Sequence, residues 1–179
     1  VTGDFVVVGA GAGGLSAATE AARQGKSVIL LEKLSFAGGS SALCEGYFWS
    51  ADAKLNAETG KGFDTETMKT ALLTAAGGHA VDKLIENICD ISAETMNGLT
   101  DNGTAFYKDQ FTGAGGAISD LDVFIAEGAG NGLIQSMLKI AQDNQVDIRY
   151  ESKGAKLIVE NGAVKGVTVE DKEGTYNIY

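Results

Sequence analysis

The sequence predicts an α/β fold, in which helices cover a parallel sheet and a β-meander follows. Residues 4–8 and 27–31 are short apolar runs rich in β-branched side chains, as in strands that lie between two helical layers. An alanine-rich segment with helical spacing, residues 13–24, separates the two runs. After residue 155 the pattern changes to strands alone, which predicts the meander.

The composition predicts one globular domain over residues 1–179. A formal net charge of −10 disfavours nucleic acid and anionic membranes as partners. Cys44 and Cys89 have no companion ligands at metal spacing, so we expect free thiols and no metal site. Since no hydrophobic leader precedes Val1, we expect a cytoplasmic protein. Because the sequence starts abruptly on a strand, removal of a leader and export to the periplasm stay open as alternatives.

The middle of the chain predicts a long loop over residues 34–62 and a largely helical segment over 64–145. Asp64 can cap a helix that ends near Ala76. A second helix is expected from Val81, where five apolar residues recur at helical spacing: Leu84, Ile85, Ile88, Ile91 and Met96. A third is expected over residues 132–142. Residues 104–126, which include Gly113, Gly115 and Gly116, have a weak pattern and remain unassigned.

Residues 146–179 are rich in strand signals. The Asn161-Gly162 pair between two apolar runs is the strongest short-range hairpin signal that a sequence offers. The expected strands are residues 146–150, 155–160, 163–170 and 175–179. Because the last strand reaches the end of the sequence, we expect an exposed sheet edge, which favours a homodimer through that edge.

A glycine-rich turn joins the first strand to the first helix within a βαβ unit, residues 1–33. Gly9, Gly11 and Gly14 form the pattern G-x-G-x-x-G, and Glu32 follows Gly14 by 18 residues at the end of the next strand. This context is that of a Rossmann-like dinucleotide site. Gly9 permits the tight turn, Gly11 the close approach of a pyrophosphate, and Gly14 the packing of helix on strand.

The start of this helix offers donors for phosphate groups. The free N–H groups over residues 13–15, with the positive end of the helix dipole, stabilise a pyrophosphate. Ala12, Gly13 and Gly14 are therefore expected cofactor contacts. Glu32 can accept hydrogen bonds from both ribose hydroxyls, and its charge repels the 2′-phosphate of NADP. NAD and FAD both remain open, because both occupy this crevice.

The segment 32–51 resembles the fumarate reductase and succinate dehydrogenase flavoprotein family, which includes flavocytochrome-type fumarate reductases and 3-ketosteroid dehydrogenases. In that family a Glu-Lys pair ends the strand, and a turn of two glycines and two small polar residues is shaped around FAD. The corresponding residues are Glu32, Lys33, Gly38, Gly39, Ser40 and Ser41. The resemblance implies FAD as the cofactor, Gly46 as a further contact in this loop, and backbone contacts from Ala155 to the adenine.

The resemblance also implies an activity. The complete protein would be a flavin-dependent oxidoreductase that passes a hydride between the flavin and a C–C bond activated by a carbonyl or carboxylate in a small-molecule substrate. The family pattern continues into a capping domain, so we expect this chain to be the N-terminal FAD-binding portion, stopping before that domain. Arg23, Arg149 and His79 belong to no motif, and the catalytic residues remain unknown.

Three matters stay open at this point. An NAD-binding dehydrogenase domain and a non-catalytic nucleotide-binding module are the alternatives to the flavin enzyme. Many family members have a further glycine or alanine pair where this chain has Glu45, Gly46 and Tyr47. The bulky Tyr47, Phe48 and Trp49 resemble the loop of the steroid dehydrogenases more closely, so the substrate is undecided among fumarate, another enoate and a ketosteroid. Asp120 and Asp122 are candidates for acid-base work, but their glycine-rich surroundings favour a solvated loop.

Overall fold

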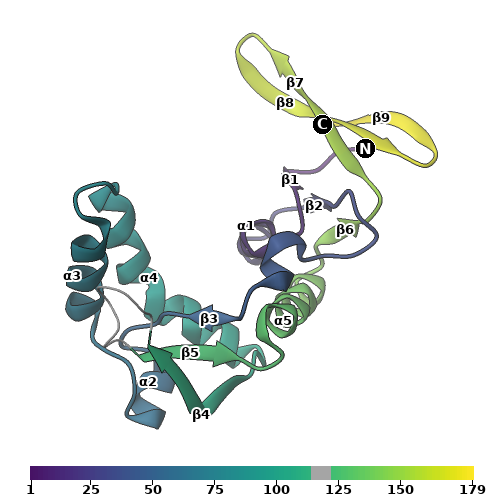
Figure 1. The fold of residues 1–179 in the computed structure, drawn as a ribbon. Helices are drawn as coiled ribbons and strands as arrows, with labels where there is room; N and C mark the ends of the chain where they lie inside the picture. The colour runs from purple at the N-terminus through teal and green to yellow at the C-terminus, as the bar shows by residue number, and fades with distance from the viewer. Residues whose placement is uncertain (114–121) are drawn as a thin grey trace. The chain divides into compact units, whose positions relative to one another are not determined.

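The computed structural model describes residues 1–113 and 122–179 (Figure 1). Gly115, Gly116 and Asp120, named above, lie outside these residues. The chain divides into two compact units. One comprises Val1–Leu43 and Ile134–Tyr179, and the other comprises Cys44–Leu133.

The first unit contains the predicted βαβ arrangement. Strands β1 (Phe5–Val8), β2 (Val28–Leu31) and β6 (Asp147–Arg149) form a parallel sheet in the order β1-β2-β6. Helix α1 (Ala12–Arg23) connects β1 to β2, and most of helix α5 (Ala129–Asp143) belongs to the same unit. The predicted parallel sheet is confirmed.

The burial of these elements differs from the expectation at one place. The four residues of β2 are all buried, and Leu15 and Ala18 of α1 are fully buried, as the apolar pattern predicts. In β1, however, Phe5 and Val8 are 49% and 56% exposed. The prediction that this strand is buried on both faces was wrong, because β1 is an edge strand of the three-stranded sheet.

The predicted β-meander is present in the first unit. Its strands β7 (Lys153–Glu160), β8 (Ala163–Asp171) and β9 (Gly174–Ile178) pair antiparallel in sequence order. Asn161 and Gly162 join β7 to β8 with φ angles of 51° and 78°, as a type I′ turn requires. Beyond β9, Tyr179 exchanges backbone hydrogen bonds with Val1 and Gly3, so the N-terminal segment covers one end of this edge.

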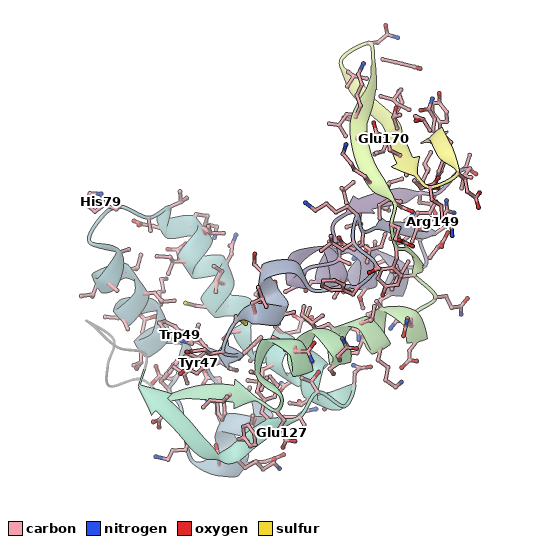
Figure 2. The ribbon with its side chains drawn as sticks, turned by 45° about the vertical axis from the view of Figure 1, so that its right-hand side comes forward. Tyr47, Trp49, His79, Glu127, Arg149 and Glu170 are labelled. Carbon is pink, nitrogen blue, oxygen red and sulfur yellow. The ribbon has the colours of Figure 1, made fainter. Side chains whose placement is uncertain are left out.

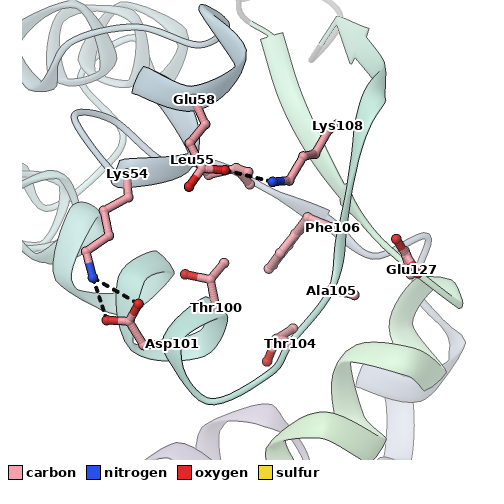
Figure 3. Close-up of a pocket in the computed structure, with 10 residues that line it drawn as sticks. All are labelled: Lys54, Leu55, Glu58, Thr100, Asp101, Thr104, Ala105, Phe106, Lys108 and Glu127. Atoms are coloured by element: carbon pink, nitrogen blue, oxygen red, sulfur yellow. Dashed lines mark hydrogen bonds and ion pairs between the residues drawn. The ribbon is translucent and has the colours of Figure 1, made fainter.

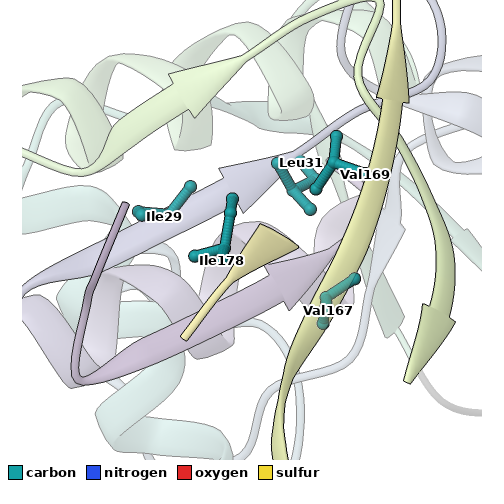
Figure 4. Packing of buried hydrophobic residues seen from close by; sticks show 5 residues of the cluster. All are labelled: Ile29, Leu31, Val167, Val169 and Ile178. Atoms are coloured by element: carbon teal, nitrogen blue, oxygen red, sulfur yellow. The ribbon is translucent and has the colours of Figure 1, made fainter. Parts of the chain in front are cut away.

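A small apolar core joins the meander to the parallel sheet (Figure 4). It consists of two residues of β2, two of β8 and one of β9, each less than 10% exposed: Ile29, Leu31, Val167, Val169 and Ile178. Burial of such side chains is the main stabilising contribution in a unit of this size. The meander therefore covers the sheet that carries the glycine turn.

The second unit combines helices with an antiparallel sheet. Its elements are β3 (Tyr47–Phe48), α2 (Lys54–Thr59), α3 (Thr65–Ala76), α4 (Asp82–Asp101), β4 (Phe106–Gly113) and β5 (Asp122–Ala126), with the strands in the order β3-β5-β4. The unassigned residues 104–126 thus contain two strands. The expected loop 34–62 contains β3, α2 and a short 3₁₀ helix, η1 (Gly39–Leu43), which belongs to the first unit.

The two long helices of this unit begin where the sequence predicts. Asp64 caps α3, since its side chain accepts a hydrogen bond from the Thr67 N–H at 2.7 Å, and this bond lowers the pKa of the Asp64 carboxyl. In α4, Met96 is fully buried, but Leu84, Ile88 and Ile91 are exposed. The apolar residues of this helix therefore lie on two faces rather than one. Among the described residues, α4 and the other helices are all too short or too polar to cross a membrane.

The core between the meander and the parallel sheet predicts a stability difference. Ile178→Ala should lower the free energy of unfolding of the first unit by about 2–5 kcal/mol, because Ile178 is fully buried and its loss leaves a cavity. Leu157→Ala, at a residue 53% exposed on β7, should change it by less than about 0.5 kcal/mol. Urea unfolding followed by circular dichroism measures both. Equal effects would contradict the packing described here.

Candidate dinucleotide site

Two glycines of the turn between β1 and α1 are required by the fold itself. Gly9 has a φ of +101°, which side chains rarely adopt, and its N–H donates to the Leu31 carbonyl at 2.7 Å. A Cβ on Gly14 would overlap the Gly9 carbonyl oxygen. Helix α1 can therefore start this close to the end of β1 only with glycine at both positions.

Gly11 and Gly13 are different, because nothing in the protein prevents a side chain there. A Cβ on Gly11 would make only ordinary contacts of 3.6 Å with the Gly38 carbonyl oxygen and Ser41 Oγ. A Cβ on Gly13 would have no atom within 4 Å. The space over the first turn of α1 is thus open, and Gly11, the N-cap, has no side chain with which to satisfy the helix N–H groups. An anion fits this position.

Glu32 lies beside the turn at the end of β2 and is only 7% exposed. Its Oε2 accepts a hydrogen bond from the Ala10 N–H at 2.9 Å, and its Oε1 accepts one from the Leu34 N–H at 2.9 Å. Each carboxylate oxygen keeps a lone pair with which to accept a further donor. The carboxylate therefore has a structural task that sequence reasoning missed, in addition to the ribose contact that it predicted.

The second glycine turn packs directly against the first. The Gly38 N–H donates to the Ala10 carbonyl at 2.8 Å, and Ser41 Oγ accepts from the Ala12 N–H at 3.3 Å. A Cβ on Gly38 would lie 2.6 Å from the Cβ of Ala42, so this position also excludes a side chain. The structure brings Gly38 and Ser41 to the glycine turn, while Gly39 and Ser40 are exposed beside them.

The segment after β6 borders the site, and it contains no recognisable sequence motif. The Ser152 N–H donates to the Glu32 carbonyl at 2.8 Å, and the Glu151 N–H to the Leu34 carbonyl at 3.0 Å. Burial and the nearby charge of Glu32 raise the pKa of Tyr150. Strand β6 pairs parallel with β2, which places the residues after β6 beside those after β2. Only a prediction of this strand pairing could have indicated from the sequence that these residues border the site.

Arg149 lies at the end of β6 (Figure 2), where a neighbouring acid holds its side chain. It donates to Asp147 at 2.6 Å, and this interaction raises the pKa of its guanidinium further. Arg149 is therefore held by Asp147 in its own strand and by the Tyr176 side chain on β9.

Three other expected contacts are placed differently. Lys33 is exposed next to Glu32. Ala155 is exposed on β7, beside Gly154, where a Cβ would lie 2.9 Å from the Val8 side chain at the end of β1. Gly46 belongs to the second unit, where a Cβ would lie 2.7 Å from the Ala129 backbone, so packing alone accounts for a glycine there.

The second unit has a pocket of its own, of about 370 Å³ (Figure 3). Four of its charged side chains form two ion pairs, Lys54 with Asp101 at 2.7 Å and Lys108 with Glu58 at 2.8 Å.

His79 is exposed in the turn between α3 and α4. Within residues 1–113 and 122–179, His, Cys, Asp and Glu side chains form no group of three that could hold a metal ion.

Comparison with known proteins decides between NAD and FAD as the cofactor. The FAD binding domain family matches residues 4–178, nearly the whole chain. The chain belongs to the FAD binding domain family. The predicted cofactor, FAD, is thereby confirmed, as is the predicted Rossmann-like FAD-binding fold.

The relatives of this FAD-binding domain include the families that the sequence resembles. The acrylate reductase flavoprotein subunit of Shewanella woodyi is 29% identical over 176 residues, which are 97% of this chain and 34% of that protein. Among solved structures, the 3-ketosteroid-Δ4-(5α)-dehydrogenase of Rhodococcus jostii RHA1 is 25% identical, with a TM-score of 0.88 over 99% of this chain and 44% of that one. A flavocytochrome c3 fumarate reductase is 26% identical, with a TM-score of 0.85 over 99% of this chain and 32% of that one. The chain spans about a third of the length of the curated relatives it matches.

Glycines with and without room for a Cβ should respond differently when each is replaced by alanine. Gly14→Ala should destabilise the first unit by more than about 2 kcal/mol, because its Cβ would overlap the Gly9 carbonyl. Gly11→Ala should cost no more than about 1 kcal/mol, the usual penalty of alanine at an N-cap, because its Cβ has room. Thermal unfolding without any ligand measures both, and equal destabilisation would contradict the geometry of this turn.

Proposed function

We propose that the chain is the FAD-binding part of a flavin-dependent oxidoreductase that acts on C–C bonds of a small-molecule substrate. The observation that carries the proposal is the open space over the first turn of α1, at Gly11 and Gly13, directly beside the buried carboxylate of Glu32. Relatives named acrylate reductase and fumarate reductase support the reaction class. Fumarate, another enoate and a ketosteroid remain the candidate substrates.

The residues around the glycine turn hold the cofactor in this proposal. The N–H groups at Gly13 and Gly14 donate to the pyrophosphate, where the helix dipole also favours negative charge. Ala12, whose N–H donates to Ser41 Oγ, is a proposed contact beside them. Glu32 accepts from the adenosine ribose with the lone pairs that Ala10 and Leu34 leave free. The remaining proposed contacts are Gly9, Gly11, Lys33, Gly38, Gly39, Ser40, Ser41, Gly46 and Ala155.

The chain's own contribution is binding and orientation. FAD, when bound, supplies the acceptance and donation of a hydride. The hydrogen bonds from Gly38 to Ala10 and from Ala12 to Ser41 fix the two glycine turns against each other, so the cofactor meets a prepared surface. We assign no catalytic residue, and we propose that the groups that handle the substrate lie outside these 179 residues.

We propose that residues 1–179 act together as one FAD-binding domain, despite their division into two compact units. In this organisation residues 1–33 form the dinucleotide unit and 34–62 the flavin loop, followed by the mainly helical part 64–145 and the strands 146–179.

Cys44 and Cys89 are both free thiols. This supports the cytoplasm, where thiols stay reduced, over the periplasm.

Isothermal titration calorimetry of the chain with FAD and with NAD tests the cofactor preference. We expect weak binding of FAD, with an affinity above that for NAD. Gly11→Ala should weaken FAD binding about tenfold or more, because its Cβ would occupy the space that the pyrophosphate needs. The matched control is Gly98→Ala, on α4, where a Cβ has room because no atom lies within 4 Å, and where FAD affinity should not change. Tighter binding of NAD would contradict the proposal.

The proposed division of labour predicts that the chain alone is inactive. Mixed with FAD, a reduced viologen dye and fumarate, it should oxidise the dye no faster than free FAD does, because it lacks substrate-handling groups. Absorbance of the reduced dye measures the rate. Turnover above that background, with fumarate or with a ketosteroid, would show that these 179 residues contain a complete active site.

A further inference from the structure

Asparagine followed by glycine is the dipeptide most prone to lose its side-chain amide, because glycine leaves the attacking backbone nitrogen unhindered. The reaction needs a glycine N–H that no acceptor holds, and a backbone that is free to rotate between the two residues. The chain contains four such pairs: Asn97-Gly98, Asn102-Gly103, Asn131-Gly132 and Asn161-Gly162. Their surroundings in the fold differ.

Two of the pairs lie within helices. Gly98 is inside α4, where its N–H belongs to the helical hydrogen bonds, and Asn97 Oδ1 accepts from the Lys54 N–H at 2.9 Å. In the first turn of α5, the Gly132 N–H donates to the Gly128 carbonyl at 2.9 Å. Rotation at either pair would break a helix, so both are protected.

The pair Asn102-Gly103 ends α4 and is held by two further bonds. The Gly103 N–H donates to the Thr100 carbonyl at 3.0 Å, and Asn102 Nδ2 donates to the Gly98 carbonyl at 2.7 Å. The nitrogen that would attack and the amide that would leave are therefore both engaged.

The fourth pair forms the turn at the free end of the β7–β8 hairpin (Figure 1). Asn161 and Gly162 are both exposed, and among the residues that the structure describes neither the Asn161 amide nor the Gly162 N–H has a hydrogen-bond partner. Rotation between them disturbs only the pair of Glu160 with Ala163, which closes the hairpin. Both requirements of the reaction are met at this pair.

We propose that Asn161 is a site of spontaneous deamidation in the folded chain. The Gly162 nitrogen gives up its proton to solvent and attacks Asn161 Cγ, so an N–Cγ bond forms and the Cγ–Nδ2 bond breaks. Nδ2 takes up a proton and leaves as ammonia. Water then opens the cyclic imide at either of its carbonyls and gives aspartate or isoaspartate. The inference is independent of the proposed function, because it involves none of the residues at the glycine turn.

The structural consequence is confined to the tip of the hairpin. Isoaspartate carries the main chain through the side-chain carbon, which lengthens the turn and removes its type I′ geometry. The register of β7 on β8 already shifts between Ile158 and Val159, so the turn positions only the pairs beyond that shift. The apolar core shown in Figure 4 lies on the other side of it. Modified chains therefore stay folded and accumulate.

Incubation of the 179-residue chain in mildly alkaline buffer, followed by trypsin digestion and mass spectrometry, tests the proposal. The peptide 157–165 contains Asn161, the peptide 84–108 contains both pairs of α4, and the peptide 109–139 contains Asn131. A parallel incubation in urea supplies the rates of the unfolded chain. In urea the four rates should agree within about threefold, whereas in the folded chain Asn161 should convert at least about tenfold faster than any other pair.

The matched control is Asn161→Gly, which removes the amide and keeps the turn, because Gly-Gly also adopts type I′ geometry. Its peptide 157–165 should show no change of –NH₂ to –OH, and circular dichroism of the aged unmodified chain should match that of fresh protein. Three results would overturn the proposal: folded rates that remain as uniform as those in urea, faster conversion at another pair, or no conversion at Asn161 while the unfolded chain converts. Loss of the fold in the aged chain would overturn the confinement to the tip.

Discussion

The approach of helix α1 to the end of strand β1 is the constraint on which the site depends. Gly14 lies so close to the Gly9 carbonyl that no side chain fits between them. This approach points the first turn of α1 at the space beyond the strand, where an anion can meet its free N–H groups. The same relation recurs in the second unit, where a Cβ on Gly132 at the start of α5 would overlap the Glu127 carbonyl. Glycine spacing in this chain therefore sets how tightly a helix follows a strand.

Glu32 connects the parts of the site around this turn. Through its two carboxylate oxygens and its carbonyl it accepts hydrogen bonds from Ala10, Leu34 and Ser152, which lie in the glycine turn, in the next loop and after β6. A buried carboxylate needs such donors, because without them its desolvation is costly. The acid that is proposed to hold the ribose therefore also holds together the segments that surround it. Substitution of Glu32 is expected to affect structure and binding together.

Much of the fold and part of the site could be predicted from the sequence. The βαβ unit, the Asp64 cap and the Asn161-Gly162 hairpin depend on neighbours in sequence, and local patterns report such neighbours well. Strands β4 and β5 were missed because glycines obscure their pattern, the register of their pairing shifts between Phe106 and Phe111, and β5 also pairs with the distant strand β3. The exposure of Phe5 and Val8 was missed because it depends on which strand lies beside β1.

The site shows the same limit. Gly9, Gly11, Gly14 and Glu32 follow from their spacing, whereas the contribution of Tyr150 and Ser152 depends on the position of β6 beside β2. In α4, the sequence shows apolar residues at helical spacing but cannot divide them between a buried face and an exposed one. Leu84 and Met96 fit the same periodic pattern, and only packing distinguishes them.

The central claim is that FAD lies on the first turn of α1, between the two glycine turns. Amide hydrogen exchange, measured by mass spectrometry with and without millimolar FAD, tests it directly and tolerates weak binding. We predict slower exchange in peptides that cover residues 9–15 and 38–41, and unchanged exchange along α4. Protection confined to other segments, or none at any FAD concentration, would contradict the claim.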